Sequence, residues 1–170
     1  MENTEAIGKS DFITLGEELQ NNKMFLNVAT KLESEGKKRI IMDRESKEPY
    51  LIRYYYQNYR PFARITIHNI LRSDIDGLHD HPWPFQTFIL AGGYWEHTPE
   101  GIFWRGPGYH GISKASDFHR LEIDHKRAGE DTWTLFLMGP KEKEWGFLDT
   151  DGNWVRYDIY LEKRKQHLRV

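Results

Sequence analysis

Two histidines separated by one residue are the feature of this sequence that most directly suggests chemistry. They are His79 and His81, in the glycine-bounded segment from Gly77 to Gly93. Side chains at positions i and i+2 of an extended strand point to the same face. Both imidazoles could therefore reach one metal ion, at about 2.0–2.1 Å if the ion is zinc-like. The alternative is a pair of structural histidines, hydrogen-bonded at the polar end of a strand.

Two further residues could complete such a centre. His119 lies in segment 117–123, which we expect to be a strand, and it would add a third imidazole from across the fold. Gln86, five residues after His81, could act on the substrate or add a weak amide-oxygen ligand; the alternative is a buried glutamine satisfied by backbone. The chain has no cysteine, which excludes thiolate sites and cysteine nucleophiles. Any metal must then be held by imidazole, carboxylate, amide oxygen or water.

A polar strand face offers a second place for chemistry. Arg64 and His68 share one face of the strand predicted over 63–71. If that face lines a cavity, the two side chains would hold an anionic substrate, a carboxylate or a phosphate, and would count among the catalytic residues. If it faces solvent, they form a polar outer surface. Ile65 and Ile67 occupy the opposite face and mark it as the core, which favours the second interpretation.

The elements that must position these residues are one helix and many short strands. The pattern is helical over 11–35, and it is clearest over 21–35, where apolar residues recur at three and four positions between Phe25 and Leu32. After Gly36 the period becomes two, and turns rich in glycine, proline and aspartate separate short strands, the last over 154–161. We expect a tail and helix over 1–36, a β-barrel over 37–162 and a basic tail over 163–170. Many short strands favour an all-β sandwich or barrel.

Length and charge narrow the class of protein. A chain of 170 residues suits one domain. A net charge of −2 and a pI near 6.4 argue against a nucleic-acid partner. No apolar stretch approaches the length of a membrane-spanning helix, and the polar, acidic N-terminus is unlike a secretory signal. We expect a cytoplasmic protein with a small-molecule substrate.

The spacing around the paired histidines resembles the first motif of the cupin superfamily. In that motif His-x-His is followed by a glutamate and then, after six residues, by a glycine. Here Gln86 stands at the glutamate position and Gly93 at the glycine. His119 resembles the histidine of the second cupin motif. Over residues 50–160 the chain also resembles a branch of cupin-like proteins of bacteria and phages, in segments 71–74, 79–83, 92–96, 119–122 and 145–147.

The resemblance implies an all-β, cupin-type barrel, a double-stranded β-helix or jelly roll, preceded by a helix. It implies one divalent ion on His79, His81 and His119, with Gln86 as a further candidate. Cupins also commonly pair through an N-terminal segment, so a homodimer is an option. Fe(II) is the favoured ion, and zinc, manganese and nickel are alternatives. Without a glutamate ligand, the ion would keep its charge and its open positions.

Four functions agree with this resemblance. The favoured one is an Fe(II) dioxygenase-like oxidoreductase that acts on a small molecule, since three-histidine iron sites occur among cupin dioxygenases. The second is a metal-dependent isomerase or lyase. The third is a metal-free enzyme similar to cupin sugar-nucleotide ketoisomerases, in which the paired histidines and Gln86 do acid–base work. The fourth is a non-catalytic cupin that binds a small molecule.

Overall fold

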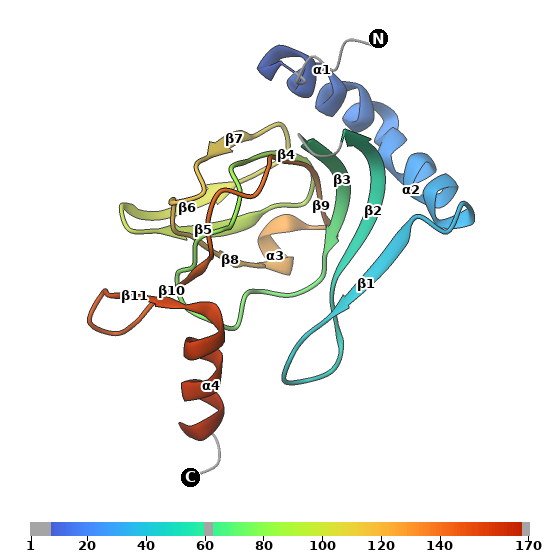
Figure 1. Ribbon diagram of the computed structural model, residues 1–170. Coiled ribbons are helices and arrows are strands. Elements are labelled where there is room, and N and C mark those ends of the chain that lie inside the picture. Colours follow the sequence, from blue (N-terminus) through green and yellow to red (C-terminus); the bar gives the residue numbers. More distant parts are fainter. Residues whose placement is uncertain (1–7, 60–62, 168–170) are drawn as a thin grey trace.

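The computed structural model describes residues 8–59 and 63–167. The chain begins with two helices, α1 (Lys9–Gln20) and α2 (Met24–Ser34), joined by the short 3-10 helix η1 (Asn21–Lys23) (Figure 1). Two more helices follow later, α3 (His125–Ala128) and α4 (Tyr157–His167). The strands are β1 (Lys38–Met42), β2 (Pro49–Tyr59), β3 (Ala63–Ile70), β4 (Phe85–Ala91), β5 (Tyr94–Thr98), β6 (Gly101–Arg105), β7 (His110–Ser113), β8 (Arg120–Glu122), β9 (Thr132–Met138), β10 (Gly146–Leu148) and β11 (Trp154–Arg156).

The strands form antiparallel sheets. The largest sheet has six strands in the order β1-β2-β3-β9-β4-β7, and a second has three in the order β6-β5-β8. Strands β10 and β11 pair as a separate hairpin. The chain is therefore mostly β with a helical N-terminal segment, as the sequence predicts.

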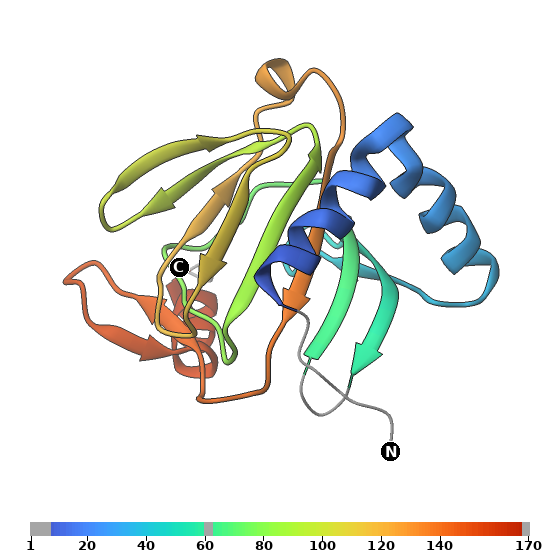
Figure 2. The same ribbon diagram turned by 90° about the horizontal axis from the view of Figure 1, so that it is seen from above.

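One face of the six-stranded sheet is covered by α1 and α2 (Figure 2). Ile65 and Ile67 of β3 point to this face and pack in the main hydrophobic core. The contact is close, because a Cβ at Gly16 of α1 would lie 2.5 Å from Cγ of Phe88 in β4. The same core contains the helix residues Phe12, Leu19, Phe25, Ala29 and Leu32.

The N-terminal helical region is divided into α1 and α2, where the sequence predicts a continuous helical pattern over 11–35, clearest over 21–35. Asn22 and Lys23 have left-handed backbone angles, with φ of 50° and 52°, and break the helix between α1 and α2. The second helix therefore starts at Met24. The break lets both helices turn apolar side chains onto the same sheet.

The C-terminal segment differs from the strand predicted over 154–161. Only β11 is strand, and α4 begins at Tyr157. Tyr157, Tyr160 and Arg164 recur at helical spacing and make contacts outside the helix. Tyr157 stacks on Trp145 with ring centroids 4.9 Å apart, and Tyr160 stacks on Phe147 at 4.2 Å. Arg164 forms ion pairs with Glu45 and Asp76.

These contacts change the predicted boundary at 163. Residues 163–167 belong to α4 instead of a basic tail, and 168–170 lie outside the described residues. Among the helices that the structure describes, none is long and apolar enough to cross a membrane.

Candidate metal centre

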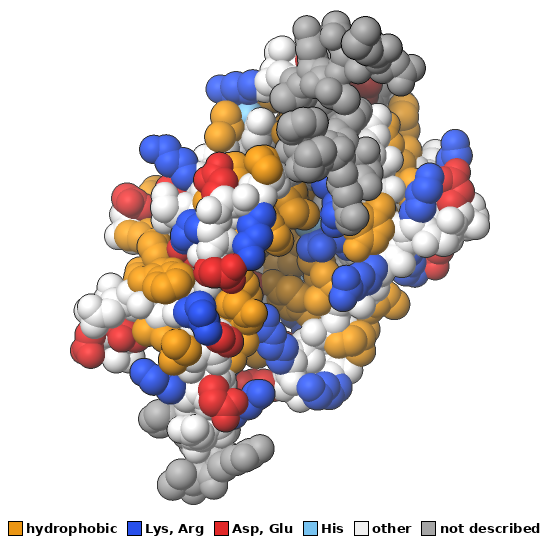
Figure 3. Space-filling view, viewed as in Figure 1, with side chains coloured by type: hydrophobic (Ala, Val, Ile, Leu, Met, Phe, Trp, Pro, Cys, Tyr) orange, Lys and Arg blue, Asp and Glu red, His pale blue; other side chains and the backbone are white. Residues whose placement is uncertain are grey.

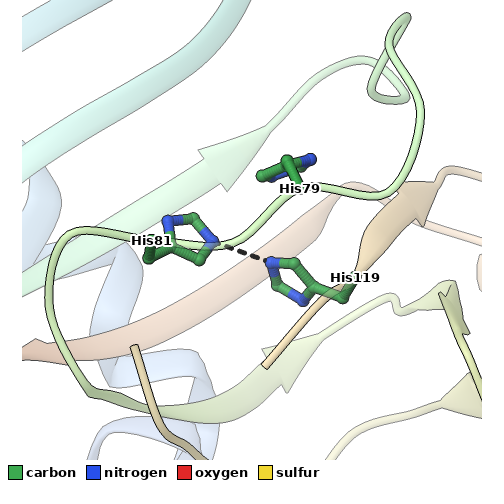
Figure 4. Close-up of side chains that lie close together, drawn as sticks. All are labelled: His79, His81 and His119. Carbon is green, nitrogen blue, oxygen red and sulfur yellow. Dashed lines mark hydrogen bonds between the residues drawn. The ribbon is translucent and has the colours of Figure 1, made fainter. Parts of the chain in front are cut away.

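The structure brings His79, His81 and His119 together (Figure 4). One ring nitrogen from each lies within 4.8 Å of the other two, and Nε2 of His81 is 2.9 Å from Nε2 of His119. Two ligand atoms at about 2.0–2.1 Å from one ion are separated by roughly 3 Å at the usual coordination angles. The separation of His81 and His119 therefore suits a shared divalent ion, and His79 lies beside them with a ring nitrogen within 4.8 Å of both.

Backbone pairing holds two of these histidines side by side. The backbone N–H of His79 donates to the carbonyl of His119 at 3.0 Å, and that of His119 donates back at 2.9 Å. Both residues lie just outside the named strands, in an isolated bridge, where the sequence predicts regular strand. An extended backbone is enough to turn His79 and His81 toward the same space.

Asp80, between the paired histidines, is buried and anchors their segment. Its carboxylate accepts hydrogen bonds from the backbone N–H of Gly146 at 2.7 Å and from Nε1 of Trp154 at 3.1 Å. It also forms an ion pair with Lys143. Asp80 thus fastens the histidine segment to the β10–β11 hairpin.

Glu96 orients His119. Its Oε1 lies 3.0 Å from Nδ1 of His119, and its Oε2 accepts a hydrogen bond from Nε of Arg105 at 2.8 Å. Burial alone would raise the pKa of Glu96, but hydrogen bonds and charges from His119 and Arg105 outweigh it and lower this pKa. The carboxylate therefore favours a proton on Nδ1 of His119, which leaves Nε2 free to bind a metal.

The other two imidazoles are also prepared as ligands. Nδ1 of His79 lies 3.3 Å from the carbonyl of Gly77, an acceptor that favours a proton on Nδ1 and a free Nε2. Burial lowers the pKa of His79, although the charge of Asp74 opposes it. Burial, and then the charge of His119, lowers the pKa of His81 well below its ordinary value. The lowered pKa values of His79 and His81 favour their neutral rings, the form that binds metals.

The donor set fits a divalent transition metal. Imidazole nitrogens suit zinc, iron, nickel and copper, whereas calcium and magnesium prefer oxygen ligands. Within the described ranges, no carboxylate joins the three histidines as a further ligand. An ion held there would keep its full positive charge.

The structure does not bring Gln86 to the three histidines. Along β4, Phe85 and Thr87 face the cavity beside the histidines, whereas Gln86 points to the other face. There its Oε1 accepts a hydrogen bond from Nε2 of His110 at 2.9 Å. The prediction of Gln86 as a ligand or catalytic group therefore fails on strand parity. Phe85 lies beside the centre instead, with its ring 4.8 Å from that of His81.

His68 faces the cavity, contrary to the favoured interpretation of its strand. Its ring is buried and stacks on Phe136 at 5.1 Å between centroids. Nε of Arg53, on the neighbouring strand, donates a hydrogen bond to Nε2 of His68 at 3.1 Å. Arg64 shares the face of His68 but is not among the residues that line the cavity; its guanidinium lies 5.8 Å from the Tyr55 ring. Arg53 is the arginine of β2 and β3 that reaches the cavity.

The cavity has a volume of about 380 Å³ and lies between the uncovered face of the large sheet, the three-stranded sheet and the β10 region. Figure 3 shows a hollow in the middle of this side of the molecule, with hydrophobic side chains in its floor and charged ones around it. The three histidines form part of its wall. Its apolar lining includes Ile70, Phe85, Leu121, Phe136, Trp145 and Phe147.

Comparison with solved structures identifies the class of fold. A cupin 2 conserved barrel domain protein from Rhodopseudomonas palustris has a TM-score of 0.54 and 10% identity, over 68% of this chain and 79% of that chain. A cupin-2 domain protein from Rhodospirillum rubrum has a TM-score of 0.52 and 11% identity, over 68% and 78%. The polyketide cyclase RemF from Streptomyces resistomycificus has a TM-score of 0.51 and 15% identity, over 72% and 87%.

The chain therefore has a cupin fold, as its histidine motif predicts. At these identities the likeness extends to the fold alone. No family model and no curated protein matches the sequence.

Glu96 is a residue of the site to which the sequence assigns no role, whereas Asp80 is predicted as an acceptor for an imidazole N–H or an exposed turn carboxylate, and Arg53 as a polar residue that lines or borders the barrel. Glu96 ends segment 92–96, one of the segments that carry the resemblance to bacterial and phage cupin-like proteins. The place of Glu96 in this segment is the one feature of the sequence that points to a role for it. Asp80 and Arg53 acquire their contacts through the hairpin at 146–156 and the pairing of β2 with β3, which no local pattern specifies.

Proposed function

We propose that this protein is a metal-dependent enzyme that acts on a small organic molecule, with the ion held by His79, His81 and His119. The observation that carries the proposal is the convergence of three imidazoles on the wall of a largely apolar cavity. A divalent ion held there would supply Lewis acidity toward a substrate oxygen and, as Fe(II), the capacity to react with dioxygen. We favour Fe(II) and an oxygenase-type reaction because three neutral ligands leave the charge of the ion uncompensated.

The protein's own residues would orient the ligands and exclude water. Glu96 keeps a proton on Nδ1 of His119, and Arg105 keeps Glu96 ionised. Phe85 packs against two of the three imidazoles, at 4.8 Å from His81 and 5.5 Å from His119 between ring centroids. These contacts fix the rings before any ion binds, which is how a rigid metal site gains affinity.

The structure argues against the metal-free ketoisomerase alternative, because the third side chain that this alternative requires, Gln86, is not beside the paired histidines. Gln86 lies on the helix-covered face of β4, bonded to His110. A homodimer, a cytoplasmic location and catalytic roles for Arg64 and His68 stay predictions.

Elemental analysis tests the proposal. Protein purified without a histidine tag and incubated with Fe(II), Zn(II), Mn(II) or Ni(II) is expected to retain one ion per chain after desalting. His81→Ala should lose the ion, and His125→Ala, which changes an exposed histidine outside the cluster, should keep it. No retained ion, or equal retention by the two variants, would refute the site.

Oxygen uptake separates the enzymatic alternatives. Fe(II)-loaded protein should consume O₂ when a substrate is present. Substrate conversion without O₂ uptake, supported equally by zinc, would identify an isomerase or lyase. A retained ion without turnover of any organic acid, aldehyde or ketone offered would favour the non-catalytic binding protein.

A further inference from the structure

Arg53 places a positive charge in the cavity, and none of the described carboxylates neutralises it. Its half-buried side chain projects from β2, opposite His68 of β3, and lines the cavity. Its Nε donates to Nε2 of His68 at 3.1 Å, and its guanidinium also hydrogen-bonds with Tyr55. Both partners are neutral side chains. A guanidinium removed from water without an anionic partner is unfavourable, so an anion would offset its burial.

The other charges near Arg53 are positive. Arg39 lies opposite it in the pairing of β1 with β2, and Arg64 lies on β3. Burial first, and then the charges of Arg64 and Arg39, lower the pKa of Arg53. The electrostatic environment at this end of the cavity therefore favours a negatively charged ligand.

The acidic residues of the cavity wall have other partners. Asp43, Asp74 and Asp76 all line the cavity. The Asp43 carboxylate accepts hydrogen bonds from the backbone N–H groups of Glu45 and Ser46. The Asp74 carboxylate accepts from the backbone N–H of Leu121 and from the Tyr50 hydroxyl. The Asp76 carboxylate forms an ion pair with Arg164. None of these contacts reaches Arg53, so its charge remains available to a ligand.

Trp83 supplies a second free donor on the same wall. Its Nε1 is buried, and among the described residues it has no hydrogen-bond partner. A buried donor without an acceptor costs about 1–3 kcal/mol, which an acceptor oxygen on a ligand would offset. The cavity thus combines unused donors with apolar walls.

We propose that the cavity binds a small organic acid, with an apolar body against the aromatic walls and one carboxylate on Arg53. The Nε1–H of Trp83 would donate to a second oxygen of the same molecule. The inference rests on the proposed function, because the three histidines line the same cavity and would face the rest of the ligand. A guanidinium fork matches the geometry of a carboxylate. A phosphate monoester carries up to two charges at pH 7. Arg44 also lines the cavity, with its guanidinium 5.9 Å from the centroid of the Trp145 ring, so binding of phenyl phosphate has to be compared directly with binding of the acids.

Calorimetric titration with two acids and their uncharged amides tests the inference. The probes are benzoate and phenylacetate, each compared with benzamide or phenylacetamide, and phenyl phosphate as a third anion. At least one acid should bind about 10-fold or more tightly than its amide. If no acid exceeds its amide, or if phenyl phosphate binds more tightly than both acids, the carboxylate site is wrong.

Variants locate the binding. Arg53→Gln should weaken binding of the acid about 10- to 100-fold, whereas Arg39→Gln, a change at an exposed neighbour, should weaken it less than about threefold. Trp83→Phe keeps the apolar surface and should weaken it about three- to tenfold. If Arg53→Gln fails to fold, Arg53→Lys, which keeps the charge and loses the fork, should still weaken the acid more than the amide. Equal affinities in wild type and in the folded Arg53 variant would overturn the proposal.

The two proposals fail separately when metal content is measured on the same samples. Arg53→Gln should retain metal as the wild type does. Binding of an acid through Arg53 by a protein that holds no metal would support the anion site and refute the metal-dependent function. Metal retention without Arg53-dependent binding would refute the anion site alone.

Discussion

Replacing Glu96 by glutamine should weaken metal binding about 10- to 100-fold. The carboxylate lies 3.0 Å from Nδ1 of His119 and 2.8 Å from Nε of Arg105, and its side chain is only 13% exposed. Glutamine keeps the shape but removes the charge that fixes the proton on Nδ1. Loss of such a partner behind a metal-binding histidine typically lowers affinity by this factor, about 1.4–2.7 kcal/mol.

Competition with a fluorescent zinc chelator at pH 7.5 measures this effect. Glu122→Gln is the matched control, because Glu122 also pairs with a histidine, His97, at 2.7 Å, but that histidine is outside the cluster. Its affinity for zinc should stay within about twofold of the wild type. Thermal unfolding shows that both variants are folded. Equal zinc affinities for Glu96→Gln and Glu122→Gln would refute the role assigned to Glu96.

Three further predictions test the framework around the centre. Burial and a neighbouring guanidinium hold the pKa of His68 well below its ordinary value, so the unfolded chain takes up the proton first as the pH falls below 6.5. Metal-free wild type should therefore lose up to about 1.4 kcal/mol more stability than His68→Gln between pH 7.5 and 5.5 in urea unfolding; equal losses would contradict this. Asp80→Asn should lower the unfolding free energy by about 1–3 kcal/mol, because it weakens the bond to Gly146 and leaves a lysine unpaired; an unchanged melting temperature would argue against the anchor. Gly16→Ala should destabilise despite a gain of about 1 kcal/mol in helix propensity, because its Cβ would clash with Phe88; a higher melting temperature would show that α1 is seated differently.

The cupin fold could be predicted because its signal is local. The spacing of His79, His81 and Gly93 lies within fifteen residues, and period-two patterns identify most of the strands. The point where strand β11 ends and helix α4 begins could not be predicted from such local patterns. Segment 154–161 alternates like a strand, but Tyr157 and Tyr160 also match a helical spacing, and stacking on aromatic partners decides for the helix.

The sequence could not show which face of the large sheet borders the cavity. Ile65 and Ile67 indicate a core, and the sequence pattern cannot show that this core lies between the sheet and α1–α2. The polar face with His68 therefore turns inward to a cavity instead of outward to solvent. Gln86 fails for a related reason. A motif fixes the number of residues to Gln86, but the turn at 82–84 decides which face of β4 it occupies.

We propose that three histidines hold one metal ion at the wall of the cavity. A crystal structure of the metal-loaded protein, with anomalous data collected on both sides of the absorption edge of the metal, tests it most directly. We expect a single anomalous peak within about 2.0–2.2 Å of Nε2 of His79, His81 and His119. A fully loaded crystal whose anomalous peak lies elsewhere, with these three imidazoles bound to no ion, would contradict it.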